Sequence, residues 1–381
     1  MGVRRAREAA SAIVRVQTFR STNLRNLASG EIGFGPGLNF LVGENGQGKT
    51  NLLEAIYFFR HGHSFRAGSD TELIRFDETF CRAEIDAEFA DAHRETFTFS
   101  VERRGAKTIK IDGQILPRRT ELAGRFPAVL FGPADLRIVS GEPDHRRRFF
   151  DMVGTMTDPA YLRCARDYRR ALEQRNAALK ARAGRDEIGA WNERLVSSGV
   201  DLISHRRELV ASMEAEMNAH AAEVESPFAF AMRYESVLLE DGGDEISEQV
   251  GLTHAFHDRL AAVAHEESRR GITLVGPHRD DIAFTLAGQD LRRFGSQGQR
   301  RLLAVLLKLA ELTHLETELR EPCVLLLDDV FSEFDASIMA RLQRMLDGAR
   351  QVFITSPVAV DDVHAPRARR FAVAGGRITS A

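Results

Sequence analysis

The sequence predicts an α/β protein that combines a mixed sheet with an inserted, mainly helical lobe. Three observations support this fold class. A glycine-rich loop separates a strand-like run from a helix-like run near residue 43. Apolar and polar residues alternate between Cys81 and Ile115, as in an antiparallel sheet with one solvated face. Helical spacing of apolar residues dominates 158–217 before strand-like runs return.

The composition is that of an ordinary globular protein. The 381 residues are 43% apolar and 28% charged, enough for two or three units with cores of their own. No stretch has the length of a membrane-spanning helix, and the N-terminal residues lack the apolar core of a signal peptide. Three widely spaced cysteines fit reduced thiols better than disulfides or zinc. We therefore expect a cytoplasmic protein without a membrane partner.

The loop GENGQGKT matches the phosphate-loop pattern GxxxxGK[ST] between a strand and a helix. Backbone N–H groups of such a loop surround phosphate oxygens, and the helix N-terminus adds partial positive charge. Lys49 is predicted to contact the β- and γ-phosphates of ATP, and the Thr50 hydroxyl to bind Mg²⁺. The predicted nucleotide contacts are Gly43, Glu44, Asn45, Gly46, Gln47, Gly48, Lys49 and Thr50. The alternative is a glycine-rich turn that caps a helix and binds nothing.

Strand-like runs follow the loop and its helix. The segments CRAEIDAEF, ETFTFSVER and TIKIDGQIL alternate in polarity, and Asp112-Gly113 has the composition of a hairpin turn. Another strand is expected near Ala128. Asp158-Pro159 then provides an N-cap and a first-turn proline for a helix. We predict that the helical lobe spans 151–268, of which 227–245 could contain a strand.

The segment CVLLLDD is a continuous apolar run that ends in two acids. Such a run suits a central parallel strand, and ligands bind at the carboxyl ends of such strands. Asp328 is predicted to hold Mg²⁺, and Asp329 to orient or deprotonate water beside the γ-phosphate. Two adjacent carboxylates repel unless a cation lies between them, which favours this interpretation over a solvated strand end.

A second polar turn precedes an apolar helix at Ser296-Gln297-Gly298-Gln299, 247 residues after Lys49. The N-terminus of that helix is another potential anion site. Because the phosphate loop already encloses most of an ATP molecule, the second turn is useful if it closes the γ-phosphate from another subunit. Ser296, Gly298 and Gln299 are therefore further predicted nucleotide contacts.

These motifs resemble those of ABC-type ATPases, in which ATP is held between the phosphate loop of one subunit and the signature turn of another. Ser332–Ser337, SEFDAS, resembles the D-loop of that class. The segments FGPADLRIVSGEPDHRRRFFD, RRALEQRNAALK, GITLVGPHRDDIAF and FGSQGQRRLLAVLLKLAEL are together similar to the RecF family of recombination mediators. The blocks occur in the family's order and extend from about residue 13 to 357.

The resemblance implies an ATPase head formed by 13–150 and 269–381, with the helical lobe between them. It implies an ATP-dependent homodimer and weak, DNA-stimulated ATP hydrolysis that uses Lys49 and Asp329. It further implies binding at junctions of duplex and single-stranded DNA during gap repair, replication restart and the SOS response. The expected partner is RecR, and the expected outcome is loading of RecA onto gaps coated by single-strand-binding protein.

Arginines are concentrated in 137–180, which holds nine Arg and one Lys against six acids, although the whole chain has a net charge of −3. Arginine contacts with phosphates give DNA affinity without sequence reading. The predicted DNA contacts are Arg146, Arg147, Arg148, Arg169, Arg170 and Arg175. The alternative is a solvated helix face, or an anchor to Asp144 or Asp151. His278 and Arg279 could face a ligand, or brace the sheet through the two acids that follow them.

Three other readings share some of these motifs. An SMC-type structural ATPase needs arms far longer than 151–268, and a transporter ATPase has its signature much nearer the phosphate loop. The third alternative is a DNA clamp in which ATP is only a binding switch. The sequence does not exclude it, because Asp329 stands where many ABC ATPases have Glu.

Overall fold

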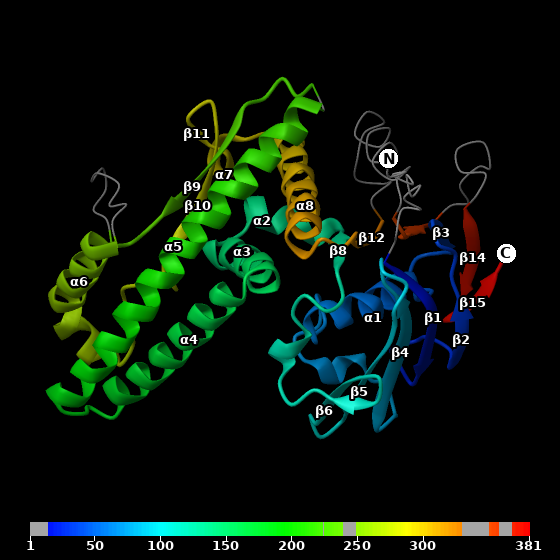
Figure 1. Ribbon diagram of the computed structural model, residues 1–381, viewed down its shortest axis with the longest axis horizontal. Coiled ribbons are helices and arrows are strands. Elements are labelled where there is room, and N and C mark those ends of the chain that lie inside the picture. The colour runs from blue at the N-terminus through cyan, green and yellow to red at the C-terminus, as the bar shows by residue number, and fades with distance from the viewer. Residues whose placement is uncertain (1–13, 224, 239–248, 330–349, 358–367) are drawn as a thin grey trace, which may run out of the picture. The chain divides into compact units, whose positions relative to one another are not determined.

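A computed structural model describes residues 14–223, 225–238, 249–329, 350–357 and 368–381. The chain forms two compact units (Figure 1). The first contains the described residues up to Pro133 and those from Leu315 onward, and the second is Ala134–His314. The first unit is therefore discontinuous in sequence, but the second begins earlier and ends later than the predicted lobe 151–268.

The first sheet of the first unit is entirely antiparallel, in the order β2-β1-β4-β5-β6-β7. Its strands are β1 (Arg15–Thr22), β2 (Gly30–Gly33), β4 (Phe80–Glu88), β5 (Arg94–Glu102), β6 (Lys107–Ile111) and β7 (Gln114–Ile115). Alternating burial along β4 explains its alternating sequence. Asp112 and Gly113 both have positive φ, 48° and 78°, so the predicted hairpin turn is confirmed.

The second sheet is mainly parallel and has the order β15-β14-β3-β13-β12-β8. Its strands are β3 (Leu38–Val42), β8 (Ala128–Phe131), β12 (Val324–Leu327), β13 (Val352–Ser356), β14 (Arg369–Ala374) and β15 (Arg377–Ser380). Every residue of β8, β12 and β13 is buried, as expected for parallel strands covered on both faces. The helix α1 (Lys49–His61) shares one apolar core with both sheets, and its Phe58 stacks on Phe99 of β5.

The second unit is mainly helical and has its own core. Its helices are α2 (Leu136–Ser140), α3 (Pro143–Thr157), α4 (Pro159–Lys180), α5 (Arg185–Glu223), α6 (Gln249–Arg270), α7 (Leu291–Phe294) and most of α8 (Gln297–Leu319). A small sheet, β11-β10-β9, joins β9 (Phe230–Glu235) to β10 (Asp281–Leu286) and β11 (Gln289–Asp290). The possible strand within 227–245 is thus present as β9. Asp158 caps α4 as expected, because its side chain accepts from Ala160 N.

The packing of α3 and β10 explains why the second unit exceeds the predicted lobe. Apolar residues of α3, including Phe150 and Val153, share a core with those of α4 and α5. The strand β10 pairs along its whole length with β9, from Asp281 opposite Glu235 to Leu286 opposite Phe230. Among the described residues, no helix is both long and apolar enough to cross a membrane.

Candidate functional site

The phosphate loop joins β3 to α1 in the first unit. Gly46 and Gly48 have positive φ, 80° and 115°, which side chains of L-residues rarely adopt. At Gly43 the constraint is space, because a Cβ there would lie 2.1 Å from the carbonyl oxygen of Val373 in β14. The loop residues Glu44, Asn45 and Gly46 are exposed. The predicted strand–loop–helix arrangement is therefore present, with a loop accessible to a ligand.

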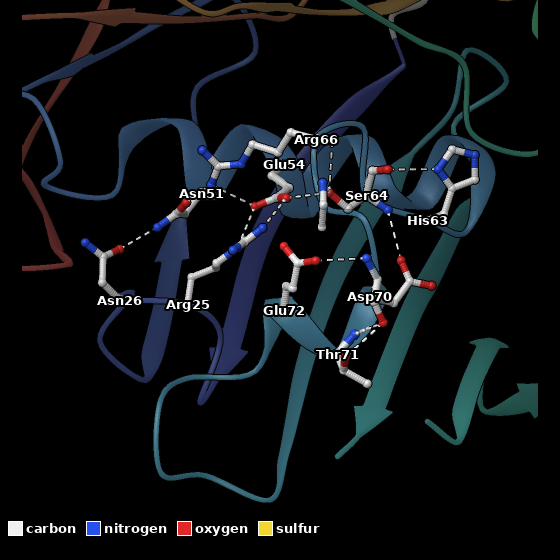
Figure 2. A network of polar contacts seen from close by, with 12 residues as sticks. Arg25, Asn26, Asn51, Glu54, His63, Ser64, Arg66, Asp70, Thr71 and Glu72 are labelled. Carbon is white, nitrogen blue, oxygen red and sulfur yellow. Dashed lines mark hydrogen bonds and ion pairs between the residues drawn. The ribbon is translucent and has the colours of Figure 1, made fainter. Parts of the chain in front are cut away.

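Two segments that the sequence did not connect with the loop hold it in place. The side-chain amide of Asn26 donates to Gly46 O (2.8 Å), and Asn26 Oδ1 accepts from Asn51 (2.6 Å) (Figure 2). In the β14–β15 turn, Gly375 N donates to Gln47 Oε1 (2.6 Å). The Gly375-Gly376 pair predicts a turn, but no sequence signal shows that this turn contacts the loop.

Lys49 is buried within the loop that it follows. Its ammonium donates to the carbonyl oxygens of Gly43 (2.6 Å) and Glu44 (2.9 Å). No carboxylate among the described residues forms an ion pair with it. Carbonyl oxygens orient the ammonium without neutralising it, so its charge is available to a phosphate group.

Thr50 and Asp328 lie side by side, although they are 278 residues apart in sequence. The Thr50 hydroxyl donates to Asp328 Oδ1 (2.8 Å), and the Thr355 hydroxyl donates to the same oxygen (3.0 Å). Burial raises the pKa of the Asp328 carboxyl and the nearby Asp329 charge adds to this, whereas the two hydroxyl hydrogen bonds oppose it. A hydroxyl and a carboxylate at this position fit Mg²⁺, which typically takes one or two protein oxygens together with phosphate oxygens.

Asp329 continues from β12 in a left-handed conformation with φ 51°. Its backbone N–H donates to Thr355 Oγ1 (2.8 Å), so Thr355 contacts both acids of the strand end. Thr355 was not among the predicted site residues. The D-loop-like segment 332–337 lies outside the described residues, so its predicted role remains a prediction.

The predicted signature turn begins α8 in the second unit. Ser296 Oγ accepts from Gln299 N (3.2 Å), and Gln299 Oε1 accepts from Ser296 N (2.8 Å). This reciprocal pair is a capping box, which fixes the start of the helix. Ser296, Gln297 and Gly298 are exposed, whereas Leu303 and the turns after it are buried. The N-terminus of α8 is thus exposed, whereas the rest of the helix is anchored in the apolar core.

The structure corrects two of the predicted DNA contacts. Arg146 is 3% exposed and makes a two-bond ion pair with Asp281 (2.6 and 2.8 Å). Arg175 is 2% exposed, and its guanidinium bonds Glu267 (2.6 Å). Neither side chain is accessible to a DNA backbone, so both predictions were wrong.

The remaining predicted DNA contacts are at least partly accessible. Arg147 is half-buried and donates to the carbonyl oxygen of Asp280 (2.7 Å). Arg148 is 78% exposed and forms an ion pair with Asp144, which has little energetic value in solvent. Arg169 and Arg170 are exposed on α4. These three exposed arginines, Arg148, Arg169 and Arg170, stay candidates for phosphate contact.

Two roles were considered for the GPHRDD segment, ligand contact and bracing of the sheet. His278 and the two acids that follow Arg279 have the bracing role. Tyr168 OH bonds His278 Nδ1 (2.6 Å), and burial lowers the pKa of His278 to about 4. The buried Asp280 accepts from Tyr234 OH (2.5 Å) and from Val237 N (2.8 Å). These contacts fix β10 against its neighbours, whereas Arg279 is exposed.

The fold and the loop geometry define an ABC-type ATPase head of the SMC-like class. A family profile described as "RecF/RecN/SMC N terminal domain" matches residues 14–362. The solved structure of an SMC head from Pyrococcus furiosus has a TM-score of 0.53 at 16% identity over 97% of this chain and 96% of that one, which shows likeness of fold alone.

Comparison with relatives narrows the class further. "DNA replication and repair protein RecF" from Geobacillus kaustophilus is 37% identical over 88% of this chain and 90% of its own. RecF from Lactobacillus delbrueckii subsp. bulgaricus is 35% identical over 89% of each chain. The solved "recombination mediator protein RecF-ATP in RecFOR pathway" covers 98% of this chain and 100% of its own, at 31% identity and a TM-score of 0.91. The chain belongs to the RecF family.

Proposed function

We propose that this protein is an ATP-dependent, DNA-binding recombination mediator. It acts at duplex/single-strand junctions in gap repair and replication restart, and with RecR it aids RecA loading onto gaps coated by single-strand-binding protein. It works in the cytoplasm, as a homodimer that ATP closes and slow hydrolysis opens. The observation that carries this proposal is the Thr50–Asp328 contact (2.8 Å) beside a phosphate loop that encloses the Lys49 ammonium.

The nucleotide role follows from the chemistry of these groups. Backbone N–H groups of the loop and the Lys49 ammonium bind the β- and γ-phosphates. Thr50 and Asp328 supply the oxygen ligands for Mg²⁺, whose charge stabilises the ionised form of the buried carboxylate. Asp329, one residue further along, orients or deprotonates the attacking water. The solved relative named RecF-ATP supports this reading, since it covers 98% of this chain.

Dimerisation accounts for the exposed signature turn. The turn donates hydrogen bonds from an exposed helix N-terminus, and the Ser296 hydroxyl and the Gly298 N–H bind the γ-phosphate of the ATP held by a second copy. DNA phosphates are then bound by Arg148, Arg169 and Arg170, the exposed members of the predicted cluster.

The test is the molar mass by light scattering with and without ATP–Mg²⁺. Wild type should change from single chains to dimers on adding nucleotide, and a gapped duplex should not be required. Ser296→Arg should bind ATP normally but stay a single chain, because a long cation occupies the exposed turn. Ser197→Arg, at an exposed position of α5, is the matched control and should dimerise.

Single chains at saturating ATP–Mg²⁺, with or without a gapped duplex, would refute the proposal. Lys49→Ala separates ATP binding from closure of the dimer. Its ATP affinity should fall by about 100-fold, because the variant lacks a buried charged contact with phosphate. Lys110→Ala on β6 provides the control for loss of one lysine.

A clamp in which ATP is only a switch is the second candidate. It is favoured by Asp329, which is shorter than the Glu found at this point in many ABC ATPases. Asp329→Asn distinguishes the two. If turnover matters, this variant should form a stable ATP dimer on DNA and fail to cycle. Normal RecA loading by Asp329→Asn would leave only the switch role. An SMC-type role would need long arms, which the second unit, Ala134–His314, does not provide.

A further inference from the structure

A cleft of about 830 Å³ opens on the first unit beside the phosphate loop. Its lining includes Arg25, Asn26, Asn51, Arg66, Arg75 and Phe76 (most of them drawn in Figure 2). Asn26 and Asn51 belong to the chain of hydrogen bonds that ends at Gly46 O. None of the six residues has a role in the ATP chemistry described above.

The cleft walls are held rigidly. Two loops are cross-linked by backbone bonds, since Arg25 N donates to Leu73 O (2.7 Å) and Arg75 N donates to Asn23 O (2.8 Å). Arg25 adopts a positive φ of 49°, which is unfavourable for an arginine, whereas Asn23, with φ 53°, is a residue type that tolerates this region. Such strain persists where surrounding structure imposes it, and it is concentrated at functional sites.

A buried carboxylate orients two of the guanidinium groups. Glu54 on α1 is 0% exposed and accepts from Arg25 Nη2 (2.9 Å) and Arg66 Nη2 (2.9 Å) (Figure 2). Burial raises the pKa of Glu54, but the hydrogen bonds from Arg25, Arg66 and Ser64 outweigh it and leave the pKa lowered. The carboxylate is therefore ionised and fixes both arginines. Their side chains remain 22% and 36% exposed toward solvent.

The cleft keeps a positive charge despite Glu54. Arg75 donates to the carbonyl oxygens of Arg25 and Leu27, and Arg103 donates to those of Arg75 (3.0 Å) and Glu78 (3.0 Å). Carbonyl partners orient a guanidinium without neutralising it. The lining residues include three arginines, Arg25, Arg66 and Arg75, and one acid, Glu72, so cations still exceed acids by one when Glu54 is included.

The same cleft is lined by an aromatic side chain, Phe76, that is exposed to solvent. Phe76 is 86% exposed, the highest value among the large apolar side chains of the described residues. Its neighbour Arg75 is fixed by the carbonyl contacts, and Asp77 adopts a positive φ of 66°, so the backbone on both sides is constrained. An exposed ring beside fixed cations is the combination with which proteins bind single-stranded nucleic acid, through base stacking and phosphate contacts.

We propose that this cleft binds a nucleotide of single-stranded DNA, with its base stacked on Phe76 and its phosphodiester bound by Arg75 and Arg66. This goes beyond the function proposed above, because it places a single-strand contact on the first unit, whereas Arg148, Arg169 and Arg170 belong to the second. A junction would then have two protein sites of different chemistry. Duplex DNA, whose bases are already stacked, gains nothing from Phe76.

The test uses a single-stranded oligonucleotide that contains 2-aminopurine, whose fluorescence reports stacking, with full-length protein saturated with ATP–Mg²⁺. Phe76→Leu keeps an apolar side chain but removes the aromatic face. We expect about 10-fold weaker single-strand binding, in the range measured for one base–aromatic stack. The fluorescence change should also be lost, with duplex affinity unchanged. Phe80→Leu, at a ring 41% exposed on β4, is the matched control and should behave as wild type.

Arg75→Gln tests the phosphate contact independently. It should reduce the salt dependence of single-strand binding by about 0.7 in log–log slope, the value of one phosphate contact. Unchanged single-strand affinity and fluorescence in Phe76→Leu would overturn the proposal. It would also be overturned if Phe76→Leu weakened ATP binding alone, because the cleft would then hold the nucleoside end of ATP. Failure of the function proposed above is distinct, since wild type itself would then remain a single chain at saturating ATP–Mg²⁺.

Discussion

Arginines on α3 and α4 form two groups that are adjacent in sequence but opposite in environment. Arg146 and Arg175 are buried and paired with acids, whereas Arg148 and Arg170 are exposed. A third buried arginine, Arg206 on α5, makes a two-bond ion pair with Asp151 (2.8 and 2.8 Å). Local density of positive charge therefore does not locate a DNA surface, because the same residue type also holds the second unit together.

Helical phase separates the two groups. On α3, Arg146 shares a buried face with Phe149, Phe150 and Val153, at spacings of three, four and seven. On α4, the buried positions are 161, 164, 168, 171, 175, 178 and 179, and Arg175 is in phase with them. The apolar positions of α4 thus place Arg175 on the buried face, but they do not show which group neutralises its charge. Each buried arginine also needs a partner from a distant segment, which no local pattern predicts.

The largest effect should come from removing a buried arginine. Arg175→Met leaves the Glu267 carboxylate buried without its cation, so we expect a loss of about 3–5 kcal/mol in the free energy of unfolding. Urea denaturation measures this loss, and adding Glu267→Met should restore part of it. Arg170→Met, at an exposed site of the same helix, should change stability by less than about 0.5 kcal/mol. Equal losses in the two single variants would remove the distinction between the groups.

His278 tests the same buried region by its pH dependence. Burial lowers its pKa to about 4 from 6.5, so between these values the unfolded chain binds more protons than the folded one. Stability should therefore fall as pH decreases from 6.5 to 4, by up to about 3 kcal/mol for this residue. The measurement is the difference between wild type and His278→Gln across this range, which cancels other titrating groups such as Asp280. A difference independent of pH would contradict the assignment of a neutral, half-buried imidazole.

The exposed group should affect DNA binding and leave stability unchanged. Replacing Arg148, Arg169 and Arg170 together by Ala should weaken duplex binding by about 10- to 100-fold at moderate salt. The log–log salt slope should decrease by about 2.7, if each arginine contacts one phosphate. The matched control replaces the same three residues by Lys, which retains the charge and should retain the slope. An unaltered slope in the Ala variant would show that the DNA surface lies elsewhere.

The smallest effect concerns Asp328, a buried carboxylate that accepts hydrogen bonds from two hydroxyl groups. Burial raises the pKa of Asp328, so the ionised form destabilises the cation-free protein above that pKa, and this cost disappears below 3.8. Asp328→Asn should therefore stabilise the cation-free protein at neutral pH, while its ATP affinity no longer responds to Mg²⁺. Thermal unfolding and nucleotide titration with and without Mg²⁺ measure the two changes. Reduced stability of the variant at neutral pH without Mg²⁺ would contradict the expected gain.

Sequence patterns predicted the local parts of the candidate site well. The phosphate loop, the acidic strand end and the start of α8 are each specified by residues close together in the chain, and all three have the expected local structure. The contacts that hold these parts in position come from segments distant in sequence. Asn26, Glu54 and Thr355 act through contacts with segments between 20 and 29 residues away. Polar residues at such separations carry no periodic signal, so their roles became clear only from the structure.

The sheet order has a consequence for how the protein is made. Both neighbours of β3, the strand that leads into the phosphate loop, come from more than 300 residues later in the sequence: β13 begins at Val352 and β14 at Arg369. During synthesis this strand has no partner in its sheet until Val352 and the residues after it have been made, whereas Ala134–His314 is already available as a contiguous segment. Pairing over such separations is slow to form and leaves apolar edges open meanwhile. A truncation before Val352 should therefore also leave the strand that leads into the phosphate loop unpaired in its sheet.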